Sequence, residues 1–197
     1  MNTTQKIALI DYGAGNVQSV LFALERLGFQ GIVTNDAAII QQADKVIFPG
    51  VGEASSAMQK LKSTGLDQVI PLLKQPVLGI CLGMQLLCRH SEEGNTNALG
   101  IFDLDVKKFS NSVKVPQMGW NTIANLKSDL FRNISENEYM YLVHSYYVPE
   151  NQYSIAQTNY GIDYASAIQK DNFYGVQFHP EKSGKVGEQI LKNFLDS

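Results

Sequence analysis

A cysteine with a glycine two residues before it and another two residues after it is the strongest chemical signal in this sequence. Cys81 follows a short apolar run, Val77–Ile80, and a segment with helical periodicity follows it. Gly79 and Gly83 complete the pattern of a nucleophile elbow, where the chain turns sharply from strand to helix and small residues permit close packing. The N-terminus of that helix favours a thiolate, and the N–H of Leu82 could hold an oxyanion. The alternative interpretation is a buried cysteine at a tight turn, with glycines that serve packing alone.

Three histidines are available as a base for this cysteine. If the elbow helix continues to His90, that residue lies about 13 Å from Cys81 along the helix axis, which is too far for proton transfer. We expect His90 to be a surface or helix-capping residue. His144 lies among aromatic residues in a predicted strand, where a structural, hydrogen-bonded histidine is the favoured interpretation.

His179 has the best surroundings for a base. It ends a predicted strand, and Pro180 favours an extended backbone at the residue before it. Side chains two residues apart in an extended chain point to the same side, so Glu181 can hold the imidazole and stabilise its charged form. A surface strand end with a solvated glutamate is the alternative for this short motif alone.

Together, Cys81, His179 and Glu181 supply a nucleophile, a base and a group that orients the base, which are the parts needed for acyl transfer through a thioester. Metal binding is a weaker hypothesis, because Cys81, Cys88 and His90 do not have the paired spacing of zinc ligands. If both cysteines occupy one helix, they lie about 10 Å apart along its axis, too far for a disulfide. We therefore expect reduced thiols, a cytoplasmic protein, no metal and no cofactor.

The first half of the chain alternates predicted strands and helices. The predicted strands span 6–11, 31–35, 45–48 and 77–80, and the predicted helices span 17–27 and 55–61, the second capped by Ser55 or Ser56. Such alternation indicates a parallel sheet, whose sites form at the carboxyl ends of the strands. Asp11–Asn16, Pro49–Gly52 and Cys81 should converge at that edge.

Two glycine-containing turns at this edge do not match nucleotide-binding motifs. The Gly13–Gly15 turn lacks the third glycine of a dinucleotide fingerprint, because Gln18 occupies that position. The Pro49–Gly52 turn lacks the length and the Lys-Ser/Thr pair of a P-loop. Pro49–Gly52 is either a plain turn or a loop whose glycines leave a backbone N–H free to face the nucleophile.

The second half is rich in β-strand signals after a polar loop at 92–98. Strands are predicted at 101–109, 113–123, 139–148, 153–158, 165–169 and 173–178, with a turn at Asp171–Asn172. Spacing of about ten residues suggests antiparallel hairpins. Residues 128–134 are predicted to form one or two helical turns, and 186–195 a final helix.

Composition excludes several classes of protein. The 197 residues are 44% hydrophobic and 18% charged with a net charge of −3, which suits one globular domain and argues against disorder and nucleic-acid binding. The sequence contains neither an apolar run of membrane-spanning length nor a signal-peptide core at Met1–Lys6.

The combination of the Gly79–Gln85 segment, the upstream Pro49–Gly52 turn and His179-Pro-Glu181 resembles the class I (triad) glutamine amidotransferases. Their order and spacing match over nearly the whole chain. The resemblance implies a single type 1 domain over 1–197. It also implies a flavodoxin-like α/β fold, with a mostly parallel central sheet flanked by helices and an antiparallel β-rich C-terminal half.

Three further segments, Asp11–Asn16, Pro116–Asn121 and Glu181–Ser183, resemble the glutaminase subunits of imidazole glycerol phosphate synthases in histidine biosynthesis. The resemblance implies that Cys81 attacks the side-chain amide of glutamine. His179 then protonates the leaving ammonia and activates water against the thioester, while Glu181 orients it.

The resemblance also assigns binding roles. The oxyanion would be held by the N–H of Leu82 and by that of Val51 or Gly52. Gln85 and the backbone of Ser145 and Tyr146 would contact the glutamine substrate.

Ammonia would pass to a (β/α)8-barrel cyclase partner in a heterodimer. There it would join a phosphoribosylated carboxamide nucleotide to give imidazole glycerol phosphate and an aminoimidazole carboxamide nucleotide. By the same resemblance Asn16, Trp120 and Lys182 would lie at the partner interface, although Trp120 could equally be a core residue. No nucleic-acid or membrane partner is implied.

Two alternatives remain open at this point. One is the glutaminase subunit of another ammonia-channelling synthase, such as the vitamin B6 type, although the Gly119–Asn121 segment and the Asp11–Gly13 start favour the first hypothesis. The other is a non-catalytic glutamine-binding regulatory relative. An intact triad argues against that, since a binder needs no base.

Overall fold

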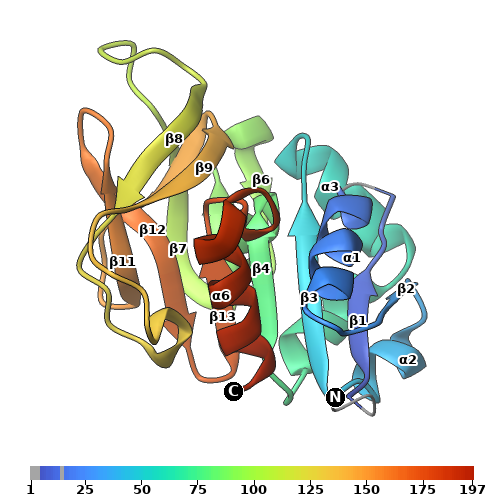
Figure 1. The fold of residues 1–197 in the computed structure, drawn as a ribbon. Helices are drawn as coiled ribbons and strands as arrows, with labels where there is room; N and C mark the ends of the chain where they lie inside the picture. Colours follow the sequence, from blue (N-terminus) through green and yellow to red (C-terminus); the bar gives the residue numbers. More distant parts are fainter. Residues whose placement is uncertain (1–4, 14–15) are drawn as a thin grey trace.

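The structure is a computed structural model, and it describes residues 5–13 and 16–197. Ala14 and Gly15, in the predicted turn after the first strand, therefore lie outside the described residues. Across the described part of the chain, one large sheet of eleven strands has helices on both faces, and β8 and β9 form a second, two-stranded sheet beside it (Figure 1).

The first half forms the parallel part of the large sheet. Its elements are β1 (Ile7–Ile10), α1 (Val17–Arg26), β2 (Gly31–Thr34), α2 (Ala37–Gln41), β3 (Lys45–Gly50), α3 (Ala54–Ser63), α4 (Leu66–Val69), η1 (Ile70–Leu72), β4 (Val77–Cys81) and α5 (Leu82–Leu87). Strands β2, β1, β3 and β4 lie side by side and run parallel. The predicted strands of this half are confirmed, whereas α2 and α4 were not predicted.

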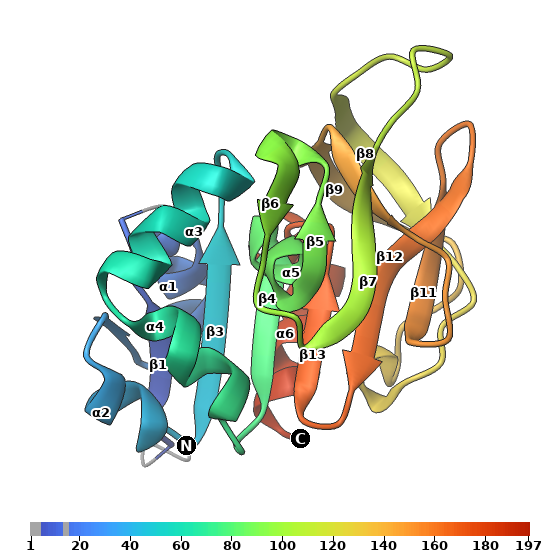
Figure 2. The same cartoon turned by 180° about the vertical axis from the view of Figure 1, so that it is seen from behind.

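Helices cover the parallel strands on both faces. Helices α1 and α6 lie on one face, and α3, α4 and α5 on the other (Figures 1 and 2). On β1, Ile7 and Leu9 belong to the core beneath α1 and α6, while Ala8 and Ile10 belong to the core on the opposite face. Every residue of the strand is buried, which explains the continuous apolar run in the sequence.

The second half extends the sheet and adds the small one. Its elements are β5 (Cys88–Ser91), η2 (Glu93–Asn95), β6 (Thr96–Asn97), β7 (Phe102–Lys108), β8 (Gln117–Ile123), η3 (Asp129–Phe131), β9 (Glu138–His144), β10 (Tyr146–Pro149), β11 (Ser154–Asn159), β12 (Asp163–Lys170), β13 (Phe173–Val176), η4 (Pro180–Lys182) and α6 (Gly184–Leu195). Antiparallel hairpins form as predicted at β11–β12 and β12–β13. However, β13 pairs parallel with β4, and β5 pairs parallel with β7.

Several predicted boundaries were wrong. The elbow helix ends at Leu87, because Cys88–Ser91 turns extended and pairs with β6 and β7; Cys88 and His90 therefore occupy a strand. The cap of α3 is Glu53 and not a serine, since its carboxylate accepts hydrogen bonds from the N–H groups of Ser55 and Ser56.

One predicted strand, 139–148, is in fact two. The chain leaves the small sheet at His144, passes Ser145 and enters the large sheet at Tyr146. Strand β9 pairs with β8, whereas β10 pairs with β7 and β12. Apolar and aromatic residues both precede and follow His144 and Ser145, so the pattern reads as one strand and does not reveal the change of sheet.

Candidate active site

Cys81 occupies a strained turn between β4 and α5. Its backbone angles are φ 55° and ψ −112°, in the half of conformational space that residues with a Cβ rarely adopt. The neighbouring glycines make the turn possible: a Cβ added to Gly83 would lie 1.9 Å from the carbonyl oxygen of Phe48, and one added to Gly79 would lie 2.8 Å from the nitrogen of Met84. The elbow geometry predicted from the sequence is therefore confirmed.

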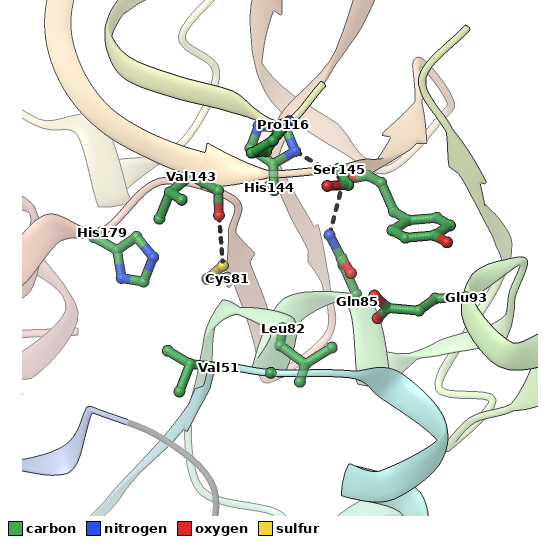
Figure 3. Close-up of a pocket in the computed structure, with 12 residues that line it drawn as sticks. Val51, Cys81, Leu82, Gln85, Glu93, Pro116, Val143, His144, Ser145 and His179 are labelled. Atoms are coloured by element: carbon green, nitrogen blue, oxygen red, sulfur yellow. Dashed lines mark hydrogen bonds between the residues drawn. The ribbon is translucent and has the colours of Figure 1, made fainter. Parts of the chain in front are cut away.

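A cavity opens above the elbow. Its volume of about 310 Å³ is within the range of small-molecule sites. Residues from several separate segments line it: Val51, Gly52, Cys81, Leu82, Gln85, Glu93, Pro116, Val143, His144, Ser145, Tyr146 and His179. Figure 3 shows His179 and Val143 next to the cysteine sulfur, with Gln85 and Glu93 farther along the cavity. The cavity lies at the carboxyl ends of β3 and β4, where a parallel sheet is expected to hold its site.

His179 lies in the cavity wall beside Cys81 (Figure 3). Its Nδ1 is 2.8 Å from Oε1 of Glu181, and the two side chains are only 2% and 1% exposed. Its other ring nitrogen, Nε2, is buried and has no hydrogen-bond partner among the described residues. Burial alone would lower the pKa of His179, but the neighbouring Cys81 and the Glu181 carboxylate outweigh it and raise the pKa to about 10.

Two polar groups contact the sulfur of Cys81. The thiol donates to the carbonyl oxygen of Val143 at 3.8 Å, and the side-chain amide of Gln177 donates to the sulfur at 3.7 Å. The amide of Gln85 in turn donates to Oε1 of Gln177 and to the carbonyl oxygen of Tyr146, both at 2.9 Å. The sulfur is thus held on one side by a buried amide network.

The loop after β3 faces the elbow closely. Gly50 pairs with Cys81, and a Cβ on Gly50 would lie 2.5 Å from the nitrogen of Gly83. Gly52 has φ +100°, a conformation that favours glycine. The N–H of Leu82 belongs to the first turn of α5, where helix donors have no partner within the helix. Val51, Gly52 and Leu82 thus lie around the same cavity as the sulfur.

The other two histidines have structural surroundings. His144 hydrogen bonds to the carbonyl oxygen of Tyr146 at 2.7 Å and to the hydroxyl of Tyr164 at 3.2 Å, and burial lowers its pKa to about 4. His90 lies in β5, contacts Asn95 at 3.0 Å and does not line the cavity. The prediction that His90 ends the elbow helix was wrong. Its position outside the cavity lining agrees with the prediction that it is not the base.

Comparison with known proteins places the chain in a family. The profile described as "Glutamine amidotransferase class-I" matches residues 8–197. The chain is 58% identical over 194 residues to "Imidazole glycerol phosphate synthase subunit HisH" of Bacteroides fragilis, covering 97% of this chain and 99% of that protein. The chain belongs to the HisH family of class-I glutamine amidotransferases.

Other relatives support this assignment. The HisH subunits of Bacteroides thetaiotaomicron and Pectobacterium atrosepticum are 57% and 49% identical to this amidotransferase, each over 97% of its length and 99% of theirs. Two solved structures share the fold: a glutamine amidotransferase and PurLQS from Thermotoga maritima. The glutamine amidotransferase has a TM-score of 0.76 and 14% identity, and the match covers 96% of this chain and 97% of that one. PurLQS has a TM-score of 0.73 and 16% identity, and the match covers 98% of each chain. The predicted family and fold class are confirmed.

Sequence reasoning missed two side chains of this amidotransferase site. Glu93, in the segment expected to be a plain loop, lines the cavity, and burial raises the pKa of its carboxyl group. The short helical turn that positions it leaves no clear periodic signal. Gln177 directly follows β13 and lies two residues before His179, so the rule that alternate residues of an extended chain share a side could have found it.

The residues expected at a partner interface lie outside the cavity lining. Trp120 is 56% exposed on β8, which rules out the core alternative, and its ring lies 6.0 Å from that of Tyr141. The amine of Lys182 lies 5.9 Å from the same Tyr141 ring. Asn16 caps α1, accepting a hydrogen bond from the N–H of Ser19 at 3.3 Å.

Neither a metal site nor a membrane span is found in the described part of this amidotransferase. Over residues 5–13 and 16–197, the His, Cys, Asp and Glu side chains do not gather in threes as metal ligands would. Within the same residues, every helix is too short or too polar to cross a membrane.

Proposed function

We propose that this protein is the glutaminase subunit of an imidazole glycerol phosphate synthase. It hydrolyses glutamine to glutamate and ammonia through a cysteinyl thioester and supplies the ammonia to a cyclase subunit. The observation that carries the proposal is the strained Cys81 elbow beside His179, whose other ring nitrogen is held by Glu181. The HisH relatives, which match over 97% of the chain, support the same function.

In the first half of the reaction, the thiol proton of Cys81 first passes to Nε2 of His179, whose raised pKa favours the imidazolium. The sulfur anion then attacks the side-chain carbonyl carbon of glutamine. Glu181 fixes the ring by accepting the Nδ1 hydrogen at 2.8 Å and stabilises the imidazolium. The N–H of Leu82 and an N–H of the loop at Val51 or Gly52 stabilise the oxyanion. The tetrahedral intermediate then collapses, and His179 gives its proton to the departing ammonia.

In the second half, a water molecule attacks the thioester carbonyl carbon. His179 removes a proton from this water, and the same N–H groups stabilise the second oxyanion. Collapse expels the sulfur of Cys81, which regains a proton from His179, and glutamate leaves. The buried position of His179, only 2% exposed, limits proton exchange with bulk water between the two steps.

The cavity offers a matching set of groups for the amino-acid end of glutamine. Both observed hydrogen bonds of Gln85 use its Nε2, so its carbonyl oxygen is left to accept a hydrogen bond from the substrate. The Glu93 carboxylate supplies negative charge suited to the α-ammonium group, and the backbone of Ser145 and Tyr146 would hold the amino and carboxylate ends. We assign Gln85, Ser145 and Tyr146 to substrate binding on this basis.

The cyclase partner is proposed to be a (β/α)8 barrel that binds over the small sheet. Met118, Trp120 and Tyr139 are large exposed side chains on β8 and β9, 66%, 56% and 60% exposed. Such exposed aromatic and apolar groups are typical of an interface, and Lys182 and Asn16 would contribute polar contacts. Direct transfer keeps ammonia from becoming ammonium, which is not a nucleophile. One domain over 1–197, a heterodimer and a cytoplasmic location remain predictions.

A glutamine-analogue electrophile tests the nucleophile directly. Mass spectrometry of the treated protein should locate one adduct on the peptide that contains Cys81. Cys88 is the matched control, because it is fully buried and burial raises its pKa, so it should remain unmodified. The Cys81→Ala variant should take up no label and Cys88→Ala should label normally. Labelling of Cys88, or the absence of any label in both the wild type and Cys88→Ala, would contradict the proposal.

A further inference from the structure

Three buried polar side chains meet beneath the turn that joins β9 to β10. His144, Tyr164 and Gln117 come from β9, β12 and β8, and they are 6%, 0% and 2% exposed. Nδ1 of His144 lies 2.7 Å from the carbonyl oxygen of Tyr146, and its Nε2 lies 3.2 Å from the Tyr164 hydroxyl. That hydroxyl lies 2.9 Å from Oε1 of Gln117. The catalytic steps proposed above use none of these three side chains.

The number of hydrogens on His144 fixes the direction of these hydrogen bonds. Burial, with a smaller contribution from His179, lowers the pKa of His144 to about 4 although the Tyr146 carbonyl opposes this shift, so the ring is neutral at pH 7 and carries one N–H. That hydrogen must be on Nδ1, because its partner is a backbone carbonyl, which can only accept. Nε2 is therefore an acceptor and needs a donor.

The Tyr164 hydroxyl is the donor within reach of Nε2. It has one hydrogen and cannot also donate to Gln117, so the amide of Gln117 must present its NH2 to the hydroxyl oxygen. A half turn of that amide achieves this, since its oxygen and nitrogen have nearly the same shape. The half turn gives Nε2 of Gln117, otherwise a buried donor without a partner in the described residues, the hydroxyl oxygen as its acceptor, and it leaves the amide oxygen unpartnered instead.

The relay therefore runs in one direction, from the Gln117 amide to the Tyr164 hydroxyl, to His144, and on to the Tyr146 carbonyl. That carbonyl also accepts a hydrogen bond from Gln85 at 2.9 Å. Building on the proposed function, we propose that His144, Tyr164 and Gln117 are positioning residues whose relay holds the Tyr146 carbonyl, and through it Gln85, in the geometry that binds glutamine. These three residues act through the binding groups and do not take part in proton transfer to the substrate.

Tyr164→Phe removes one hydroxyl from the relay and keeps the ring. Tyr160→Phe is the matched control, because both rings lie edge-on to Phe109 at 5.6 Å, while the Tyr160 hydroxyl donates instead to the exposed backbone carbonyl of Lys114. With the cyclase present, Tyr164→Phe should raise KM for glutamine about fivefold, the effect of one hydrogen bond, and leave kcat within about twofold. Tyr160→Phe should match the wild type in both.

Glutamine binding gives a readout without catalysis. In a Cys81→Ala background, calorimetry should show that Tyr164→Phe weakens the affinity for glutamine by about the same fivefold factor, and that Tyr160→Phe does not. Equal KM and equal glutamine affinity in the two tyrosine variants would overturn the proposal.

Nitrogen-15 NMR of the imidazole rings tests the direction of the relay independently of activity. With three histidines in the sequence, assignment is straightforward. The wild type should show His144 as the neutral Nδ1–H tautomer. Tyr164→Phe should keep this tautomer and shift the Nε2 resonance toward that of an imidazole nitrogen that accepts no hydrogen bond, because the donor to Nε2 is then missing. A neutral Nε2–H tautomer in the wild type, or an unchanged Nε2 resonance in Tyr164→Phe, would contradict the relay.

These results separate the two proposals. If the wild-type protein with its cyclase does not hydrolyse glutamine and Cys81→Ala does not bind it, the proposed function fails, whatever the tautomer of His144. If the wild type hydrolyses glutamine but Tyr164→Phe behaves as Tyr160→Phe does, the relay fails alone. Should Tyr164→Phe not fold, the tautomer of His144 in the wild type still decides.

Discussion

The His179–Glu181 pair gives the sharpest quantitative prediction, tested by Glu181→Gln. The change keeps the size of the side chain and removes its charge 2.8 Å from Nδ1 of His179. At an effective dielectric constant of about 20, two unit charges at this distance attract by about 6 kcal/mol. The cost of desolvating two nearly fully buried groups offsets several kcal/mol of that attraction, which leaves about 3 kcal/mol for stabilising the imidazolium.

A loss of about 3 kcal/mol in transition-state stabilisation corresponds to a fall in kcat of about a hundredfold. The assay is steady-state glutamine hydrolysis with the cyclase and its ligand present. Glu188→Gln is the control, since it makes the same chemical change in the partly exposed ion pair with Arg26, and its kcat should not change. If Glu181→Gln keeps more than about a third of the wild-type kcat, or alters KM alone, the assigned role of Glu181 is wrong.

The pH dependence of the same variant has a defined sign. The pKa of folded His179, about 10, lies above its ordinary value of 6.5. Its charged form therefore stabilises the fold fully below pH 6.5, and this contribution is lost as pH rises through about 10. Removing the Glu181 carboxylate lowers the pKa of His179, so the alkaline limb of the kcat profile should move to lower pH. An unchanged alkaline limb would show that another group sets it.

The remaining predictions concern the nucleophile, the base, the partner and the elbow. Cys81→Ala should abolish glutamine hydrolysis yet still bind the cyclase in a pull-down or calorimetric titration; near wild-type turnover would refute the nucleophile assignment. His179→Ala should be nearly as severe in the same assay, and a larger loss in His144→Ala would show that the wrong base was chosen. The isolated protein should hydrolyse glutamine weakly and the complex with liganded cyclase strongly, so full activity without the cyclase would argue against partner dependence. Gly83→Ala should lower the free energy of unfolding in denaturant titrations by about 2 kcal/mol, because its Cβ would lie 1.9 Å from the Phe48 carbonyl oxygen; an unchanged midpoint would contradict the close packing.

The sequence predicted best where local chemistry and local geometry coincide. Gly79, Cys81 and Gly83 are close in the chain, and the steric need for each glycine follows from the elbow itself. Likewise His179 and Glu181 are separated by one proline, so their contact needed no knowledge of distant residues. The buried parallel strands were also predictable, because an apolar run with both faces covered has a simple pattern.

Features fixed by distant partners could not be predicted from local patterns. Cys88–Ser91 continues a helical pattern, and its pairing with β6 and β7 decides that it is a strand. Glu93 reaches the cavity from a polar segment, where its carboxylate accepts a hydrogen bond from the N–H of Ala54, and such a contact between distant segments leaves no periodic signal. The relay of His144, Tyr164 and Gln117 joins three strands and was invisible for the same reason.

Ser145 separates the two sheets while lining the cavity. Strand β9 presents Tyr139 to the outside at one end and reaches this residue at the other. If the cyclase contacts the outer end of β9, as proposed, that contact and the proposed glutamine-binding backbone at Ser145 belong to one continuous segment of the chain. A displacement of β9 on subunit association would then shift Ser145, and a bound glutamine would resist the same displacement.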